Sequence, residues 1–127
     1  IKIVCCYGGQ PSGKQINALK RNPQIIVATP GRFSDHMKRR TIKVDAVQTV
    51  VLDEADRMLD MGFIHDVTRI LDKIPHRRNL GLFSATISRE VMDIAWVYQR
   101  DAEEITVRAD AGCQSGNHAP HFEQRRL

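Results

Sequence analysis

The stretch VQTVVLDEAD, residues 47–56, decides the fold, because an apolar run passes without a break into a group of acids. Val, Leu and Thr dominate its first six residues, a pattern typical of a strand in a parallel sheet that is buried on both faces. In open parallel sheets, ligands bind at the carboxyl ends of the strands. The stretch therefore predicts an α/β fold in which Asp53 and Glu54 lie at a ligand-binding edge.

Similar apolar runs alternate with amphipathic stretches along the chain. The predicted strands are residues 1–7, 24–29, 47–52, 80–85 and 103–107. The predicted helices are residues 13–21, 31–40, 63–74 and 88–99, with Pro75 ending the third and Ser88 capping the fourth. This alternation predicts a parallel sheet with helices on both faces.

The pattern covers residues 1–107 and stops there. Residues 108–127 are rich in Gly, Ser, Asn, His and Gln. They show neither the apolar period of a helix nor that of a strand, which predicts a linker or a disordered tail. No apolar run approaches the roughly 18 residues of a membrane span. Cys5 and Cys6 are most simply small buried residues in a reducing, cytoplasmic setting. Because no initiator Met precedes the first strand, we expect the chain to begin inside a longer protein.

The net charge of +4 is modest, but the basic residues are clustered at 38–40, 76–78 and 125–126. Such clusters suit a polyanionic partner. From charge alone, a solvated surface explains them equally well.

The acids after residue 52 fit the chemistry of a nucleotide-bound metal. Mg²⁺ is usually held by one or two carboxylates, often through water, together with substrate phosphates, and Asp53 is placed for this. Glu54 could orient or deprotonate the water that attacks a γ-phosphate. The alternative is that the two acids only stabilise the start of the next helix, and for an isolated pair this simpler explanation is favoured.

The wider context favours the catalytic interpretation. The segments TPGR (29–32), VLDEADRMLDMGF (51–63) and SAT (84–86), together with the glycine pair at 8–9, resemble the DEAD-box family of ATP-dependent RNA helicases and occur in that family's order. The resemblance covers roughly residues 1–107 and implies a RecA-like, P-loop NTPase type of fold that lacks its first strand–helix units. It also implies an enzyme that uses ATP and Mg²⁺ to unwind or remodel RNA.

The resemblance implies a role for each matching residue. Asp53 would contact Mg²⁺ through water, and Glu54 would position the hydrolytic water. Four residues would couple ATP hydrolysis to RNA handling, with the aspartate hydrogen-bonded to the serine and threonine hydroxyls: Asp56, Ser84, Ala85 and Thr86. Six residues would contact the RNA sugar-phosphate backbone without reading its bases: Gly8, Gly9, Thr29, Pro30, Gly31 and Arg32.

The segment GGQPSGKQ, residues 8–15, approaches the phosphate-binding pattern G-x-x-x-x-G-K-[ST] but departs from it. Gln15 replaces the hydroxyl that binds Mg²⁺, and Pro11 removes a backbone donor. We therefore expect Lys14 and Gln15 to belong to an ordinary polar helix. Since the chain would then lack a phosphate cradle, we expect these 127 residues alone to be inactive.

Several alternatives stay open. The chain could be a non-catalytic RNA-binding or interaction module built on half a helicase domain, or a compact NTPase that uses the loop at Gly8. A truncated sheet would expose an edge, which self-association could cover. We also expect His36 on a surface and Trp96 against the sheet, and we interpret the spacing of Cys113, His118 and His121 as chance and not as a metal site.

Overall fold

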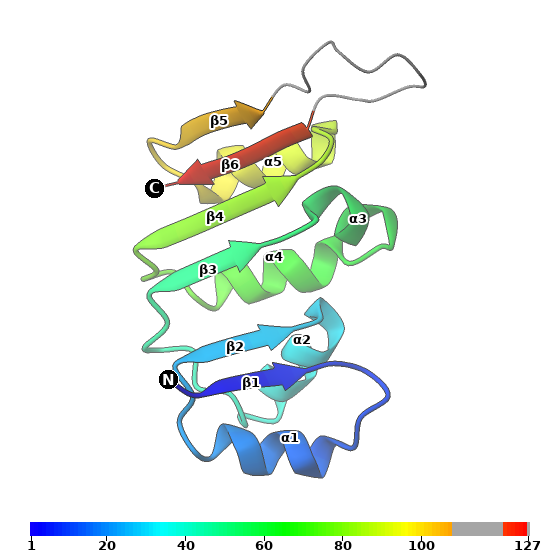
Figure 1. Ribbon diagram of the computed structural model, residues 1–127, viewed down its shortest axis with the longest axis vertical. Helices are drawn as coiled ribbons and strands as arrows, with labels where there is room; N and C mark the ends of the chain where they lie inside the picture. Colours follow the sequence, from blue (N-terminus) through cyan, green and yellow to red (C-terminus); the bar gives the residue numbers. More distant parts are fainter. Residues whose placement is uncertain (108–120, 127) are drawn as a thin grey trace. The chain divides into compact units, whose positions relative to one another are not determined.

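The computed structural model describes residues 1–107 and, for the backbone alone, residues 121–126 (Figure 1). The described residues group into two units. The first unit consists of residues 1–46 and 65–74, and the second consists of residues 47–64 together with the described residues from 75 onward.

The first unit contains two parallel strands, β1 (Ile3–Cys6) and β2 (Ile25–Ala28), with Ile3 opposite Ile25. Its helices are α1 (Ser12–Leu19), α2 (Pro30–Lys38) and nearly all of α4 (Ile64–Asp72). A buried core joins β1, α1 and the segment after α2; its members are Val4, Cys6, Leu19 and Ile42. The elements agree with the predicted ones to within a few residues.

The second unit contains the parallel pair β3 (Thr49–Leu52) and β4 (Asn79–Ser84), with Leu52 opposite Leu82. The short helix α3 (Ala55–Asp60) follows β3, and α5 (Arg89–Tyr98) follows β4. The last two strands are β5 (Glu103–Val107) and β6 (His121–Arg126). The strand order is β3-β4-β6-β5, so β4 and β5 are not neighbours although they follow each other in the chain.

The strand β6 differs from the sequence prediction. Residues 121–126 form a strand that pairs antiparallel with both β4 and β5, where the composition predicted a linker or disordered tail. The sheet of the second unit is therefore mixed and not wholly parallel. Residues 108–120 and 127 of the predicted tail lie outside the described residues.

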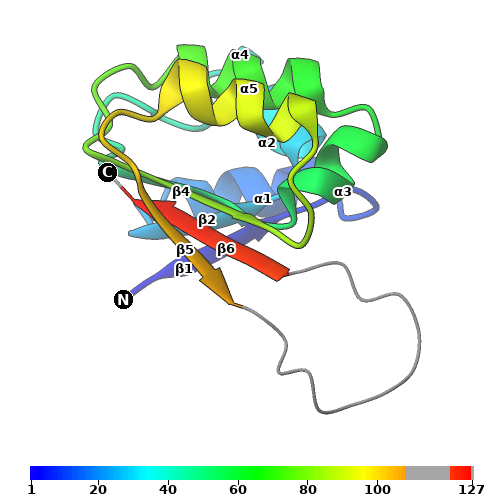
Figure 2. The same ribbon diagram turned by 90° about the horizontal axis from the view of Figure 1, so that it is seen from above.

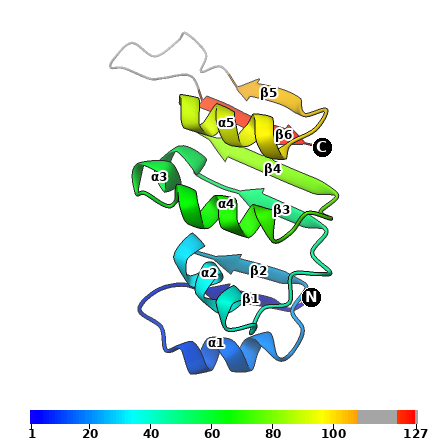
Figure 3. The ribbon, with the colours of Figure 1, turned by 180° about the vertical axis from the view of Figure 1, so that it is seen from behind.

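Among the described residues of each unit, helices cover one face of the strands (Figure 2 and Figure 3), whereas the sequence predicted helices on both faces. In Figure 2, α5 lies on one side of the sheet formed by β4, β6 and β5, and Figure 3 shows α2 in front of β2 in the first unit. The side chains of β1 alternate between exposed and buried, and Ile3, Val27 and Val51 are exposed. This period of two is that of a strand with one covered face. It also corrects one cysteine assignment, because Cys6 is buried whereas Cys5 is exposed.

The last helix confirms one prediction and corrects another. The Ser88 hydroxyl accepts a hydrogen bond from the Val91 amide at 3.3 Å, as an N-cap should. Trp96, expected against the sheet, is 77% exposed. The buried stripe of α5 runs through Val91, Ile94 and Ala95, and Trp96 lies off that stripe.

No helix among the described residues combines the length and the apolar character needed to cross a membrane.

The exposure of Trp96 can be tested by fluorescence, because the chain has a single tryptophan. We expect strong quenching of its emission by acrylamide in the native protein, and little shift of the emission maximum on unfolding in urea. By circular dichroism, Trp96→Ala should lower the free energy of unfolding by less than about 1 kcal/mol. Leu80→Ala, which empties a buried position, should lower it by about 2–5 kcal/mol. A blue-shifted, poorly quenched native emission would contradict the structure.

Candidate active site and nucleic-acid interface

The acidic turn after β3 is exposed and strained. Asp53 follows the strand directly, and its Oδ1 accepts a hydrogen bond from the Glu54 amide at 2.9 Å. Glu54 has φ +51° and ψ +47°, in the left-handed region that costs a non-glycine residue roughly 1–2 kcal/mol. Residues held in such conformations cluster at active sites. The turn leaves both carboxylates exposed to solvent at the end of the strand.

Asp56 makes the specific contacts of this site. The parallel register of β3 and β4 brings the segments after both strands together. The Oδ2 atom of Asp56 accepts from the Thr86 hydroxyl at 2.9 Å and from the Thr86 amide at 3.1 Å. Ser84 completes the arrangement, because its Oγ accepts from the Asp56 amide at 3.2 Å and donates to the Thr86 carbonyl at 2.6 Å. The loop after β3 and the loop after β4 are thereby fixed to each other.

These hydrogen bonds lower the pKa of Asp56. Partial burial of the carboxyl opposes the change and would by itself raise the pKa, but the bonds from the Thr86 hydroxyl and from the amides of Arg57 and Thr86 outweigh it. The ionised form of Asp56 is therefore the one that the fold stabilises.

The first unit brings together the segments that resemble RNA-binding motifs. The turn Gly8-Gly9 follows β1, and Gly9 has φ +84°, a conformation that favours glycine. A Cβ atom added at Gly8 or Gly9 would meet no atom within 4 Å. Because β2 lies beside β1, the Thr29 amide donates to the Cys6 carbonyl at 3.1 Å, which holds the start of α2 beside this turn.

The start of α2 has the features of an anion site. Thr29 is the N-cap in extended conformation and its side chain makes no capping bond, while Pro30 occupies the first turn. The backbone amides of this turn are therefore directed out of the helix and not used by a side-chain cap. Arg32 lies in the same turn, and its Nη1 donates to Ser12 Oγ at 2.8 Å. Two of the basic clusters of the sequence lie elsewhere in the fold: residues 38–40 are at the other end of α2, and Arg77 donates to the Tyr98 carbonyl at 2.7 Å.

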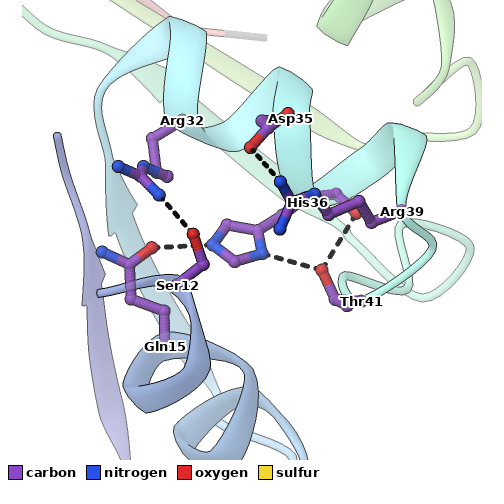
Figure 4. Close-up of polar contacts among 7 residues, drawn as sticks. All are labelled: Ser12, Gln15, Arg32, Asp35, His36, Arg39 and Thr41. Atoms are coloured by element: carbon purple, nitrogen blue, oxygen red, sulfur yellow. Dashed lines mark hydrogen bonds and ion pairs between the residues drawn. The ribbon is translucent and has the colours of Figure 1, made fainter. Parts of the chain in front are cut away.

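The interior between α1 and α2 holds a polar network that the sequence did not predict (Figure 4). Gln15, expected on an ordinary polar helix, is 2% exposed, and His36, expected on a surface, is 1% exposed. His36 Nε2 lies 2.7 Å from Gln15 Oε1, and His36 Nδ1 lies 2.7 Å from Thr41 Oγ1. Burial is the main cause that lowers the pKa of His36, and the positive charge of the nearby Arg32 lowers it further.

This network also removes the apparent phosphate loop. In the pattern at residues 8–15, Gln15 stands at the position that should supply a magnesium ligand. Its amide oxygen is engaged with His36, and its amide nitrogen donates to the Tyr7 carbonyl and to Gln10. The side chain is thus directed into the protein, which removes the main support for an NTPase centred on Gly8.

The described residues contain no group of three or more His, Cys, Asp or Glu side chains that could enclose a metal ion. A metal at the acidic turn would therefore rely on Asp53 together with water and phosphate oxygens. We interpret the spacing of Cys113, His118 and His121 as chance. Cys113 and His118 lie outside the described residues, and for His121 the backbone alone is described.

A family model described as "DEAD/DEAH box helicase" matches residues 1–94. The chain belongs to the DEAD/DEAH box helicase family.

Relatives in this family are similar to the chain over most of the chain's length. It is 50% identical over 108 residues to the DEAD-box ATP-dependent RNA helicase CshA of Bacillus subtilis, which covers 85% of this chain and 22% of the relative. It is 47% identical over 109 residues to the ATP-dependent RNA helicase CshA of Listeria monocytogenes, covering 86% of this chain and 21% of that one. The chain thus spans about a fifth of the length of the curated relatives it matches.

Solved structures agree on the fold of this chain. A DEAD box protein from the hyperthermophile Methanococcus jannaschii matches with a TM-score of 0.75 and 48% identity, covering 80% of this chain and 28% of that one. A hypothetical ATP-dependent RNA helicase from Sulfolobus tokodaii matches with a TM-score of 0.75 and 41% identity, covering 79% and 30%. The fold is RecA-like, as the family resemblance implied, and the chain contains part of such a domain.

The structure brings the predicted site residues into two groups. One group lies in the second unit, at the ends of β3 and β4: Asp53, Glu54, Asp56, Ser84, Ala85 and Thr86. The other lies in the first unit, at the ends of β1 and β2: Gly8, Gly9, Thr29, Pro30, Gly31 and Arg32. Sequence reasoning missed Ser12, Gln15 and His36. The one available signal was the placement of Gln15 four residues before the buried Leu19, on the same helix face.

The pKa of Asp56 predicts an acid-sensitive contribution to stability. Its ordinary pKa is 3.8 and the folded value is lower, so the contribution is complete above the unfolded pKa and is lost as the pH falls through the folded value. Thr86→Val removes one hydroxyl donor and should lower the free energy of unfolding at pH 7 by about 0.5–1 kcal/mol, a range reduced for solvent exposure. We expect urea unfolding to show this difference at pH 7 and a smaller one near pH 3. Ser88→Ala is a suitable control, because it removes a capping hydroxyl without touching Asp56. An equal loss at both pH values for Thr86→Val would contradict the assignment.

Proposed function

We propose that this chain is part of an ATP-dependent RNA helicase, in which it contributes the acids of the ATPase site and one RNA-binding surface. The observation that carries the proposal is the bonding of Asp56 to Thr86, beside two exposed acids at the end of a parallel strand. The names of the relatives support the same activity, since they are ATP-dependent RNA helicases.

Asp53 and Glu54 fit the roles of metal-binding and water-positioning acids. Asp53 is exposed at the strand end, and its described contact is with the backbone of the next residue, so its remaining oxygen capacity is open to a hydrated cation. When bound, Mg²⁺ would neutralise phosphate charge at this position. Glu54, exposed and fixed by the turn, would accept a hydrogen bond from the attacking water and orient it.

Asp56, Ser84, Ala85 and Thr86 would couple the ATPase site to RNA handling. A displacement of the loop after β3 cannot leave the loop after β4 unchanged, because Thr86 donates to Asp56 through both its amide and its hydroxyl. The same pair would therefore transmit a change in nucleotide state from one loop to the other.

The first unit would bind the RNA backbone in a sequence-independent manner. Open space at Gly8 and Gly9, the amides at the start of α2 and the guanidinium of Arg32 together form a surface suited to phosphate and sugar. Because such contacts do not read bases, affinity should depend strongly on salt and weakly on sequence.

Three further proposals concern the location of the protein, its self-association and the activity of the 127-residue chain alone. We propose a cytoplasmic location, and self-association of the 127-residue chain through its exposed sheet edge. We also propose that the 127 residues alone neither bind ATP tightly nor hydrolyse it, since Gln15 of the apparent phosphate loop is engaged internally.

The catalytic proposal can be tested in a chimera. The B. subtilis relative is similar enough for residues 1–107 to replace its matching segment. In this chimera, Glu54→Gln should lower kcat for RNA-stimulated ATP hydrolysis by at least about 100-fold, because a general base is lost, while ATP affinity stays nearly unchanged. The measurement is steady-state ATP turnover with and without RNA.

Two controls accompany the chimera. Lys14→Ala should leave the affinity for ATP unchanged, whereas a loss of ATP binding would restore the NTPase centred on Gly8. Titration of the 127-residue chain with ATP and Mg²⁺ should show no sub-micromolar binding. Full ATPase activity in Glu54→Gln would refute the role of Glu54.

A second candidate function is a non-catalytic RNA-binding module, favoured by the Arg32 surface in the first unit. It predicts that the 127-residue chain binds single-stranded RNA without nucleotide. Arg32→Ala should weaken this binding about tenfold and lower the salt slope by about 1, as expected for one lost phosphate contact. Fluorescence anisotropy with a labelled oligouridine at several salt concentrations measures both quantities.

Arg39→Ala is the matched control for Arg32→Ala, because Arg39 follows the same helix at its other end and pairs with Asp35 at 3.7 Å on the surface. We expect a change of less than twofold for this variant. Equal losses for both arginines would show a diffuse electrostatic effect and not a site at the start of α2.

A further inference from the structure

The amide of Gln15 joins both ends of the glycine turn. Its Nε2 donates to the Tyr7 carbonyl at 2.9 Å, before Gly8, and to Gln10 Oε1 at 3.0 Å, after Gly9. Both hydrogens of the side-chain amide are therefore used within one turn. The glycines between these contacts have no side chains of their own to hold them, and glycine has the largest conformational freedom of any residue.

The orientation of Gln15 is fixed in turn by His36. Since the amide nitrogen faces Tyr7 and Gln10, the amide oxygen faces His36 and must accept a hydrogen from Nε2. In the neutral ring that burial favours, Nε2 therefore carries the hydrogen, and Nδ1 lies 2.7 Å from the Thr41 hydroxyl, which also donates to the His36 carbonyl at 3.1 Å. Every polar atom of the Gln15 side chain has a partner, as its burial requires.

A second bond joins the same two helices nearer to the surface. Arg32 Nη1 donates to Ser12 Oγ at 2.8 Å, so the first turn of α2 is tied to the first turn of α1. Two separate contacts thus connect α2 with α1. Arg32 bonds to Ser12 in the first turn of α1. His36 bonds to Gln15, which in turn bonds to Tyr7 and Gln10 on either side of the glycine pair. Figure 4 shows Gln15 and Ser12 on α1 facing His36 and Arg32 on α2.

We propose that Gln15, oriented by His36, is a positioning residue for RNA binding: it holds the Gly8-Gly9 turn in place beside the start of α2, so that both can contact one RNA backbone. This inference rests on the proposed RNA-binding function of the first unit. Gln15 and His36 are buried and do not touch RNA themselves. Their contribution is preorganisation, because a turn that is already ordered loses less conformational freedom on binding.

A purely structural role for Gln15 would give a different result. Replacing it would then affect RNA binding only through the fraction of folded protein, and any equally destabilising change in the same network would act alike. Thr41→Val supplies that comparison. It removes the contacts of the Thr41 hydroxyl with His36 Nδ1 and with the His36 carbonyl but leaves the contacts from His36 through Gln15 to the turn in place.

The experiment measures RNA affinity of the 127-residue chain with labelled oligouridine at several salt concentrations, under conditions in which circular dichroism shows each variant to be folded. Gln15→Met, neutral and similar in size, should weaken binding about five- to tenfold with an unchanged salt slope, since no charged contact is removed. Thr41→Val should change affinity less than twofold. Amide exchange by NMR should accelerate at Gly8 and Gly9 in Gln15→Met and stay unchanged there in Thr41→Val.

The outcomes are distinguishable. If Arg32→Ala weakens binding but Gln15→Met does not, or if Thr41→Val weakens it as much as Gln15→Met, the positioning role is refuted while the RNA-binding proposal stands. If the unsubstituted chain does not bind RNA, or if Arg32→Ala has no effect, the proposed function of the first unit fails and the inference fails with it.

If Gln15→Met does not fold, Gln10→Ala decides, because it removes one acceptor in the turn itself. Binding that is about two- to threefold weaker supports the positioning role, and unchanged binding overturns it.

Discussion

The parallel pairing of strands is the constraint on which both groups of site residues depend. Parallel neighbours end at the same edge of a sheet, so the segments that follow them must lie side by side. In the first unit, β1 and β2 place the glycine turn beside the start of α2, and in the second, β3 and β4 place Asp56 beside Thr86. A register shift of one residue would reverse every side chain and separate these partners.

The two units stabilise their loops with different chemistry, and burial explains the difference. At the exposed edge after β3, the loops are joined by an ionised carboxylate, whose charge solvent and several donors can satisfy. Between α1 and α2, the connection is made by an amide and a neutral imidazole in a nearly solvent-free interior. A carboxylate at that position would have to be desolvated, which costs far more than burying a fully bonded amide.

The sequence was sufficient for the elements and for contacts between motifs, but not for contacts that depend on packing. The apolar run before the acids predicted β3, and the serine before an amphipathic stretch predicted the N-cap at Ser88. The family resemblance predicted the bonding of Asp56 to Thr86. Gln15 and His36 were missed because polar residues on short helices are usually exposed, and their pairing spans 21 residues. Trp96, expected against the sheet, is exposed because it lies off the buried stripe of α5, and its apolar character alone does not show this. The strand β6 was missed because it is defined by its pairing with β4 and β5, and composition does not show such pairing.

The acids after β3 also show why one short motif can hold residues with opposite requirements. Asp53 and Glu54 are exposed. Their described contacts are with the neighbouring backbone and with the exposed side chain of Arg57, so both carboxylates remain accessible to a hydrated cation or a water molecule. Asp56 accepts two bonds from Thr86 of the neighbouring loop and cannot leave without breaking them. The left-handed conformation of Glu54 separates these two environments, since it turns the chain sharply between the strand and α3. A cost of roughly 1–2 kcal/mol in this conformation is therefore consistent with a turn that keeps two acids in solvent and directs a third toward Thr86 in the loop after β4.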